Sequence, residues 1–346
     1  MQVYLAKGVL ATTAIEGNTL SEEQVREVVD GTLALPPSRE YLQREVQNVL
    51  EAYNEAHGEI RENPAAPLTV DWLCRFNERI LRGLELEVGV EPGRLREGSV
   101  AVGRYLAPPA EDVLYLLERL CDWMNGDDFS PPEGQRELAV PLTIVKAIAA
   151  HLYLAWIHPF GDGNGRTARL LELKILLSAG FPAPTCQLLS NHYKLTRTEY
   201  YRRLDEASRS NEELAFLEYA VGGFVDQLSE QLGTIQRNQF SDRWEQFIYQ
   251  SFGGRQGDTA NRQRRLVLAL SRRYAEALVP VSRSEVRNLH PELAAAYAIK
   301  TEKTVTRDLN ALVGLSLLRK DRHGFVPTYE QIQGLQPEVH GDLLTS

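Results

Sequence analysis

The chain has 346 residues, and at about 150 residues per domain this length favours two domains. Its 43% apolar and 25% charged residues exclude a disordered or fibrous protein, and the net charge of −9 argues against a protein that coats nucleic acid along its whole length. The three cysteines lie far apart without a C-x-x-C pair, which excludes a disulfide framework and a thiolate zinc site. We therefore expect a protein of a reducing, cytoplasmic compartment.

The first 235 residues are predicted to be mostly helical, because apolar side chains recur three and four positions apart. Residues 1–95 are expected to form an N-terminal helical region, which begins with a helix over about 3–17. A capping box at 21–24 opens the next helix. The N-terminus has no basic leader, and no run of about 18 apolar, uncharged residues is evident, so we expect no membrane partner.

A short hairpin is predicted within residues 96–235, which are otherwise expected to be helical. In the segment Gly98–Tyr105, β-branched Val100 and Val102 alternate with small residues between two glycines, and Pro108-Pro109 stops it. We call this segment the flap. Its candidate contact residues are Val100, Val102 and Gly103.

The charge balance changes near a glycine-rich stretch at 252–258, and we place a linker region at 236–260. Residues 255–330 contain 14 Lys/Arg and 8 Asp/Glu, a net charge of +6, which leaves −15 for the remainder. Residues 261–330 are predicted to form three helices followed by two strands, which is the order of elements in a winged helix-turn-helix domain. Residues 331–346 are a C-terminal tail. The fold class is thus mostly α, with a helical core, a small β-hairpin flap and a winged helix-turn-helix domain.

The most informative segment runs from Ile157 to Arg169, with the sequence IHPFGDGNGRTAR. One apolar helix, expected over 145–157, enters a loop with three glycines in five positions, and a second helix, expected over 167–177, leaves it. The free N–H groups and the dipole at that second helix's N-terminus favour an anion. Arg166 and Arg169 lie three residues apart and share one helix face, so both can neutralise a polyphosphate.

Each of these residues also has an ordinary structural interpretation. A single histidine after a helix is usually a packed residue, Asp-Gly is usually a turn, and two arginines usually form a solvated face. The joint pattern H-x-F-x-D-G-N-G-R-x-x-R is nevertheless poorly explained by chance.

This pattern resembles the signature of the Fic family and is complete from His158 to Arg169. The resemblance covers roughly residues 1–235 and implies that residues 96–235 form the catalytic core. It implies a protein adenylyltransferase, which transfers AMP from ATP to a Ser, Thr or Tyr hydroxyl of an unidentified target protein and releases pyrophosphate. ATP is then the substrate and Mg²⁺ the cofactor.

The resemblance also implies a role for each matching residue. His158 would be the general base, Phe160 would point into the core, and Asp162 would hold Mg²⁺ against the phosphates. The flap would pair with the target main chain, and Tyr200 and Tyr201 are candidates for the adenine pocket. The nucleotide and phosphate ligands would be Gly163, Asn164, Gly165, Arg166 and Arg169.

A segment near the N-terminus resembles the inhibitory motif of the same family. Thr12 and Glu16 lie four residues apart on one helix face, and Gly17 follows as a helix C-cap. A carboxylate from Glu16 paired with Arg169 would occupy the place where the γ-phosphate should be neutralised. The alternative is an exposed terminal glutamate without a partner.

Other functions stay open at this point. Some relatives use the same glutamate to remove AMP, and others transfer a different phosphate-containing group. A nucleotide-sensing, DNA-binding regulator would need the anion site but no base, so the intact His158 favours the enzyme. Family members often dimerise, and a homodimer is an alternative here too.

In the winged helix, the segment 301–309 is the expected recognition helix. Its candidate DNA contacts are Lys303, Thr304 and Arg307, together with Arg322 on the wing. Contacts to protein are nearly as well supported as contacts to DNA.

Overall fold

The computed structural model describes residues 2–102, 105–210 and 213–332. It is mostly helical, as the sequence predicts, and it divides into two compact units, Met1–Ser229 and Glu230–Ser346. The first unit contains α1 (Gln2–Ile15), α2 (Glu22–Val29), α3 (Glu40–Glu62), α4 (Val70–Leu81), α5 (Val113–Asn125), α6 (Ala139–Ile157), α7 (Asn164–Ser178), α8 (Leu188–Leu195) and α9 (Arg197–Ser210). The boundary between the units falls within α10 (Glu213–Ser251).

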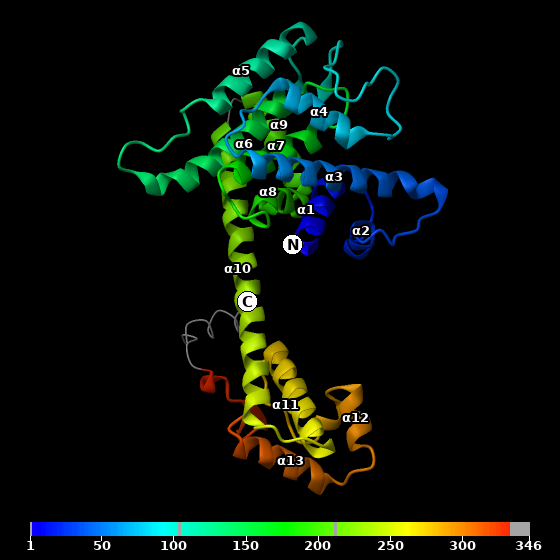
Figure 1. The fold of residues 1–346 in the computed structure, drawn as a ribbon, viewed down its shortest axis with the longest axis vertical. Coiled ribbons are helices and arrows are strands. Elements are labelled where there is room, and N and C mark those ends of the chain that lie inside the picture. Colours follow the sequence, from blue (N-terminus) through cyan, green and yellow to red (C-terminus); the bar gives the residue numbers. More distant parts are fainter. Residues whose placement is uncertain (1, 103–104, 211–212, 333–346) are drawn as a thin grey trace. The chain divides into compact units, whose positions relative to one another are not determined.

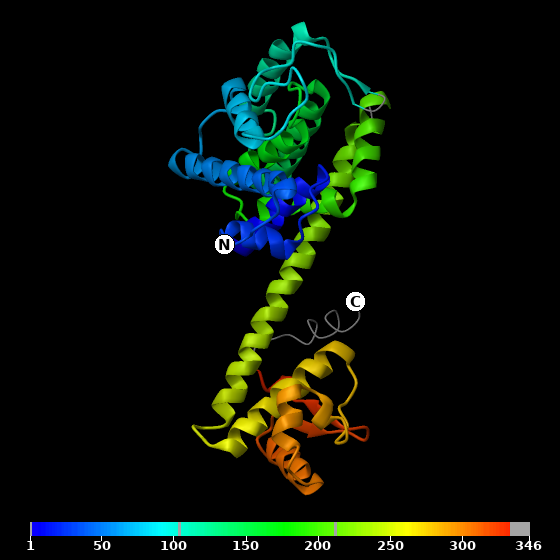
Figure 2. The same ribbon diagram turned by 90° about the vertical axis from the view of Figure 1, so that its right-hand side faces the viewer.

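The first unit is built around the pair α6 and α7, which pack against each other along their lengths. Helices α3 and α4 contact α7, α5 contacts α6, and α1 lies against α8 (Figure 1, Figure 2). One continuous apolar core joins these helices and includes Val9 of α1 and Val49 of α3, both almost completely buried. The expected N-terminal region 1–95 therefore shares its core with the expected catalytic core 96–235 instead of forming a separate body.

Among the described residues, the helical stretch Arg136–Ile157, which joins the 3-10 turn Arg136–Leu138 to α6, is long and apolar enough to cross a membrane by length and composition alone. It is not a fully uncharged run, because it contains Lys146. Its buried residues include Ala147, Ile148, Leu152 and Leu154, which belong to the core of the first unit. An apolar helix in the centre of a helical domain has this composition because it is covered on several sides.

The flap is a two-stranded antiparallel hairpin of β1 (Ala101–Val102) and β2 (Tyr105–Leu106). Outside the strands, the N–H of Ala107 donates to the carbonyl of Val100 at 3.0 Å. Leu106 is 69% exposed. The candidate Gly103 lies outside the described residues.

The second unit contains α11 (Asp258–Ala277), α12 (Pro291–Tyr297), α13 (Glu302–Gly314), β3 (Leu318–Lys320) and β4 (Phe325–Pro327). The two strands are antiparallel, with Leu318 opposite Pro327 and Lys320 opposite Phe325. This order of elements is the one that the sequence predicts for a winged helix; the winged-helix assignment itself stays a prediction. Short 3-10 helices lie at Pro37–Arg39, Ala110–Asp112, Arg136–Leu138, Thr185–Gln187, Val286–Asn288 and Tyr329–Gln331.

The expected linker at 236–260 is wrong for most of its length. Residues 236–251 are helical within α10, and Trp244, Ile248 and Phe252 are buried in the core of the second unit. These three residues recur every fourth position and form one apolar face, a helical signal that the nearby glycines obscured.

Candidate functional site

His158 follows the last residue of α6 and lies in the left-handed conformation, with φ 48° and ψ 58°. Its ring Nδ1 is 3.3 Å from the carbonyl oxygen of Ala155, and because a carbonyl only accepts, this contact requires the proton on Nδ1. Nε2 is then the basic nitrogen of the ring. Burial lowers the pKa of His158 below 6.5, and the charge of Arg96 lowers it further, so the neutral imidazole predominates at pH 7.

The loop after His158 is held closed by a side chain that the sequence analysis assigns to phosphate binding. The amide of Asn164 accepts from the N–H of Phe160 at 3.0 Å and donates to its carbonyl at 2.8 Å. Phe160 is buried in the core, as expected. The side chain of Asn164 thus fixes the loop, and only its backbone remains available to an anion at the start of α7.

Asn77 of α4 is a second residue that shapes this loop, and the sequence analysis did not find it. Its Nδ2 donates to the carbonyl of Asp162 at 2.9 Å, and its Oδ1 accepts from the N–H of Gly93 at 3.0 Å. Gly163 lies at φ 78°, and a Cβ there would be 2.8 Å from Nδ2 of Asn77. Both the left-handed conformation and the close approach require glycine at position 163.

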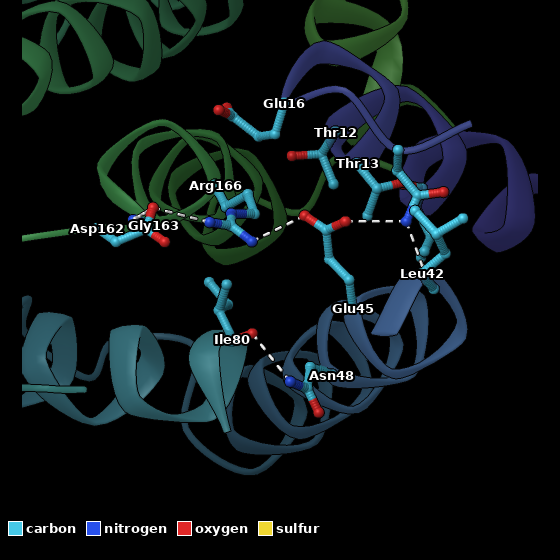
Figure 3. A network of polar contacts seen from close by, with 12 residues as sticks. Thr12, Thr13, Glu16, Leu42, Glu45, Asn48, Ile80, Asp162, Gly163 and Arg166 are labelled. Carbon is cyan, nitrogen blue, oxygen red and sulfur yellow. Dashed lines mark hydrogen bonds and ion pairs between the residues drawn. The ribbon is translucent and has the colours of Figure 1, made fainter. Parts of the chain in front are cut away.

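Arg166 lies between two carboxylates (Figure 3). Its Nη1 is 2.8 Å from Oε1 of Glu45 on α3, and its Nη2 is 3.0 Å from Oδ1 of Asp162. The other oxygen of Glu45 accepts from Nδ2 of Asn18 at 2.8 Å. Burial raises the pKa of Glu45 despite the opposing attraction of Arg166. A chain of polar contacts therefore runs from Asn18, just after the predicted inhibitory motif, through Glu45 of α3 to Arg166, the arginine predicted to bind phosphate.

Sequence reasoning missed Glu45, although one signal was present. Leu42, Val46 and Val49 define the buried face of α3, and Glu45 lies on that same face. A carboxylate among buried apolar positions needs a cationic or hydrogen-bonding partner. The partner is 121 residues away in the chain, so no local pattern identifies it.

Arg169 is 1% exposed and is bound by both members of the predicted inhibitory motif. Its Nη2 is 2.5 Å from Oε1 of Glu16, and its Nε donates to Oγ1 of Thr12 at 2.7 Å. Burial alone would raise the pKa of Glu16, but the charge and hydrogen bond of Arg169 outweigh it and lower that pKa. Glu16 is thus ionised at neutral pH, and the structure brings it to the arginine that the sequence pairs with it.

Gly165 makes room for this contact. A Cβ at position 165 would lie 2.5 Å from Oε1 of Glu16 and 3.0 Å from Nη1 of Arg169. The end of α1 is also held by α9, since Nε of Arg197 donates to the carbonyl of Ile15 at 2.7 Å. The position of Glu16 is therefore fixed by its own helix as well as by Arg169.

The two adenine-pocket candidates differ. Tyr200 is 2% exposed, and its hydroxyl lies 2.9 Å from Nε2 of His151 in a cluster of buried aromatic rings. A ring buried in this way offers no accessible face to a base, so the assignment of Tyr200 is wrong. Tyr201 is 40% exposed and stays a candidate, and its hydroxyl donates to the carbonyl of Ile15 at 3.3 Å.

Asp162 fits the predicted role of a metal ligand. Its carboxylate is 46% exposed beside the start of α7, and one oxygen contacts Arg166. The part of the chain that the structure describes contains no cluster of three His, Cys, Asp or Glu residues suited to a metal ion. A single carboxylate is compatible with Mg²⁺, which binds through one or two carboxylates together with substrate phosphates and water.

The predicted DNA contacts lie on the second unit. Lys303 and Arg307 are exposed on α13, Thr304 is half-buried on the same helix, and Arg322 is exposed in the turn between β3 and β4. Exposed Arg319 and Lys320 lie on β3.

Residues 67–176 match the model of the Fic/DOC family. The chain contains a Fic domain. The matched range includes the loop from His158 to Arg169 and the flap, and it lies C-terminal to Glu16.

Curated relatives of this Fic domain are named as adenylyltransferases. The protein adenylyltransferase fic-1 of Caenorhabditis elegans is 32% identical over 197 residues, which are 57% of this chain and 35% of that protein. The protein adenylyltransferase Fic of Nematostella vectensis is 30% identical over 200 residues, 58% of this chain and 42% of that protein. The chain thus matches less than half the length of these relatives.

Solved structures agree in fold. A Fic family protein from Desulfovibrio desulfuricans G20 has a TM-score of 0.54 at 24% identity, with 92% of this chain and 82% of that chain covered. Fic-1 of C. elegans (residues 134 to 508) has a TM-score of 0.54 at 28% identity, with 66% and 63% covered.

Proposed function

We propose that this protein is an autoinhibited adenylyltransferase that transfers AMP from ATP to a hydroxyl side chain of another protein. The observation that carries the proposal is the joint placement of a neutral, basic His158 and two buried arginines around one loop and helix N-terminus. The curated relatives that match this Fic domain are adenylyltransferases by name, which supports the same reaction class.

The proposed reaction needs a base and an anion site. The target hydroxyl oxygen attacks the α-phosphorus, its proton passes to Nε2 of His158, and the bond from the α-phosphorus to the bridging oxygen of the β-phosphate breaks to release pyrophosphate. The backbone N–H groups at the start of α7, with Arg166 and Arg169, would bind the phosphate charges. Asp162 would hold Mg²⁺, which neutralises phosphate charge when bound.

The position of the label in ATP tests this reaction class. Protein carrying Glu16→Gly is incubated with ATP and Mg²⁺, with the label in the α-phosphate or in the γ-phosphate. In the absence of its target we expect the protein to modify one of its own hydroxyl side chains, and so to retain α-label only, with a mass gain of one AMP. Retention of γ-label would instead show phosphoryl transfer, and ATP binding without any retained label would support the nucleotide sensor.

A second function, DNA binding by the second unit, is favoured by the exposed cations on α13 and β3 and by the net charge of +6 over 255–330. We expect full-length protein to shift duplex DNA at low salt, and the affinity to fall steeply as salt rises because phosphate contacts release counterions.

An electrophoretic shift assay with two matched variants measures this. Lys303→Glu combined with Arg307→Glu should abolish the shift, whereas Arg255→Glu combined with Arg273→Glu changes the charge equally elsewhere and should reduce it less. Absence of any shift at micromolar wild-type protein would contradict DNA binding and leave protein contact as the role of this unit.

A further inference from the structure

Arg96 lies between α4 and the flap, and its backbone runs beside the loop that follows His158. The N–H of Arg96 donates to the carbonyl of Pro159 at 2.9 Å, and the preceding Leu95 forms an antiparallel bridge with Phe160. Arg96 is 8% exposed. An arginine outside the Fic signature is thus buried directly against the residues next to the predicted base.

The guanidinium of Arg96 caps the end of α6. Its Nε donates to the carbonyl of His158 at 2.8 Å, and its Nη2 to that of Ile157 at 3.3 Å. Carbonyls at a helix C-terminus lack partners within the helix and carry partial negative charge, so a cation is favourable there. This contact also fixes the peptide that follows the left-handed His158.

The same guanidinium joins both ends of the flap. Nη1 donates to the carbonyl of Gly98 at 2.7 Å, just before the hairpin, and Nη2 donates to the carbonyl of Pro108 at 2.6 Å, just after it. The planar guanidinium of Arg96 therefore donates to a carbonyl at each end of the flap and to the carbonyl of His158. A lysine ammonium keeps the charge but lacks the planar fork that reaches all these carbonyls.

Among the described residues, the printed hydrogen bonds of the Arg96 guanidinium all go to backbone carbonyls, and its positive charge lies close to the imidazole of His158. It is one of the groups that lower the pKa of His158, whereas Glu16 and Asp162 raise it. A purely structural helix cap requires neither the contact with both flap ends nor this effect on the imidazole.

We propose that Arg96 is a positioning residue that holds the flap in register with His158, so that a target hydroxyl bound along the flap lies at Nε2 of the imidazole. This inference rests on the proposed AMP transfer. Arg96 does not contact the phosphate-binding residues, so it should affect the reaction of the hydroxyl and not the binding of ATP.

The test compares Arg96→Lys and Arg96→Met in protein that also carries Glu16→Gly. We expect kcat for AMP transfer to fall about 10- to 100-fold in Arg96→Met, because a displacement of about 1 Å at the reacting atoms has a cost of this order. The KM for ATP should change less than about twofold. Arg94→Lys is the matched control, since Arg94 is exposed two residues away and pairs with Glu91.

The pH profile separates positioning from simple loss of fold. Loss of the Arg96 cation raises the pKa of His158, so the acidic limb of kcat should move to higher pH in Arg96→Met and stay in place in Arg96→Lys. Asp162 acts on His158 equally in both variants, and Glu16 is absent from both. An unchanged kcat, an unchanged acidic limb in Arg96→Met, or a loss confined to the KM for ATP would overturn the proposal.

Hydrogen exchange requires no catalytic activity, so it tests the structural role of Arg96 independently of the proposed function. Hydrogen exchange of peptides covering Gly98, Pro108 and His158 should accelerate in Arg96→Met relative to Arg94→Lys, with exchange in α3 unchanged. If the Glu16→Gly protein transfers no AMP, the proposed function fails, and this exchange result alone decides whether Arg96 joins the flap to the helix end. Equal exchange in both variants would refute that link.

Discussion

Replacing Glu16 with glycine is expected to raise the rate of AMP transfer about 10- to 100-fold, the factor expected if a competent state is populated at only 1–10%. Oε1 of Glu16 is 2.5 Å from Nη2 of Arg169, and it fills the space next to the glycine at position 165. A phosphate cannot enter that space while the carboxylate is there. Loss of the carboxylate frees both the cation and the space.

The measurement is the initial rate of AMP incorporation together with the affinity for ATP. Glu16→Gln keeps a hydrogen-bonding group and removes the charge, so it should give an intermediate rate. Glu23→Gly, at an exposed position of α2, controls for the introduction of glycine and should behave as wild type. If Glu16→Gly and wild type have equal rates and equal ATP affinities over a range of Mg²⁺ concentrations, Glu16 is not a brake.

Replacing His158 with alanine in the Glu16→Gly protein is expected to lower kcat about 10²- to 10⁴-fold, the usual contribution of a general base. The affinity for ATP should stay the same, because the ring is bound to the end of α6 and not to the arginines. His57→Ala, which changes a half-buried histidine on α3, is the matched control. Equal activity of His158→Ala and the control would show that another group accepts the proton.

The pH dependence of the His158-containing enzyme follows from its lowered pKa. A base acts in its neutral form, and burial together with Arg96 lowers the pKa of His158 below 6.5. The rate should therefore rise with pH through this lowered pKa and reach its plateau at a lower pH than an ordinary histidine would give. A midpoint of the rise at or above pH 6.5 would contradict a lowered pKa of His158.

The local part of the site could be predicted from sequence, because its residues lie within one loop and one helix turn. His158, Asp162, Arg166 and Arg169 occupy the places that their spacing requires, and Glu16 meets Arg169 as its motif implies. The helices could be predicted as well, because the spacing of apolar residues that indicates a helix is a local feature of the sequence.

The partners that come from distant parts of the chain could not be predicted. Glu45, Asn77 and Arg96 contact the loop from 121, 85 and 62 residues away, and a hydrogen bond over that separation leaves no pattern in the neighbouring sequence. The buried state of Tyr200 escaped prediction for the same reason, because the rings around it belong to α6, α8 and α10.

Because Glu16 directly follows α1 in the same chain, the contact between Glu16 and Arg169 should not depend on the concentration of the protein. Glu16 and Arg169 belong to the same chain, and α1 is packed into the same core as α7, so the carboxylate is supplied at a constant local concentration. The fraction of molecules whose Arg169 is covered by its own Glu16 then does not depend on dilution. Under the proposed function, a change in the amount of protein should change the number of active molecules only in proportion. A factor that displaces α1 should instead change the active fraction itself.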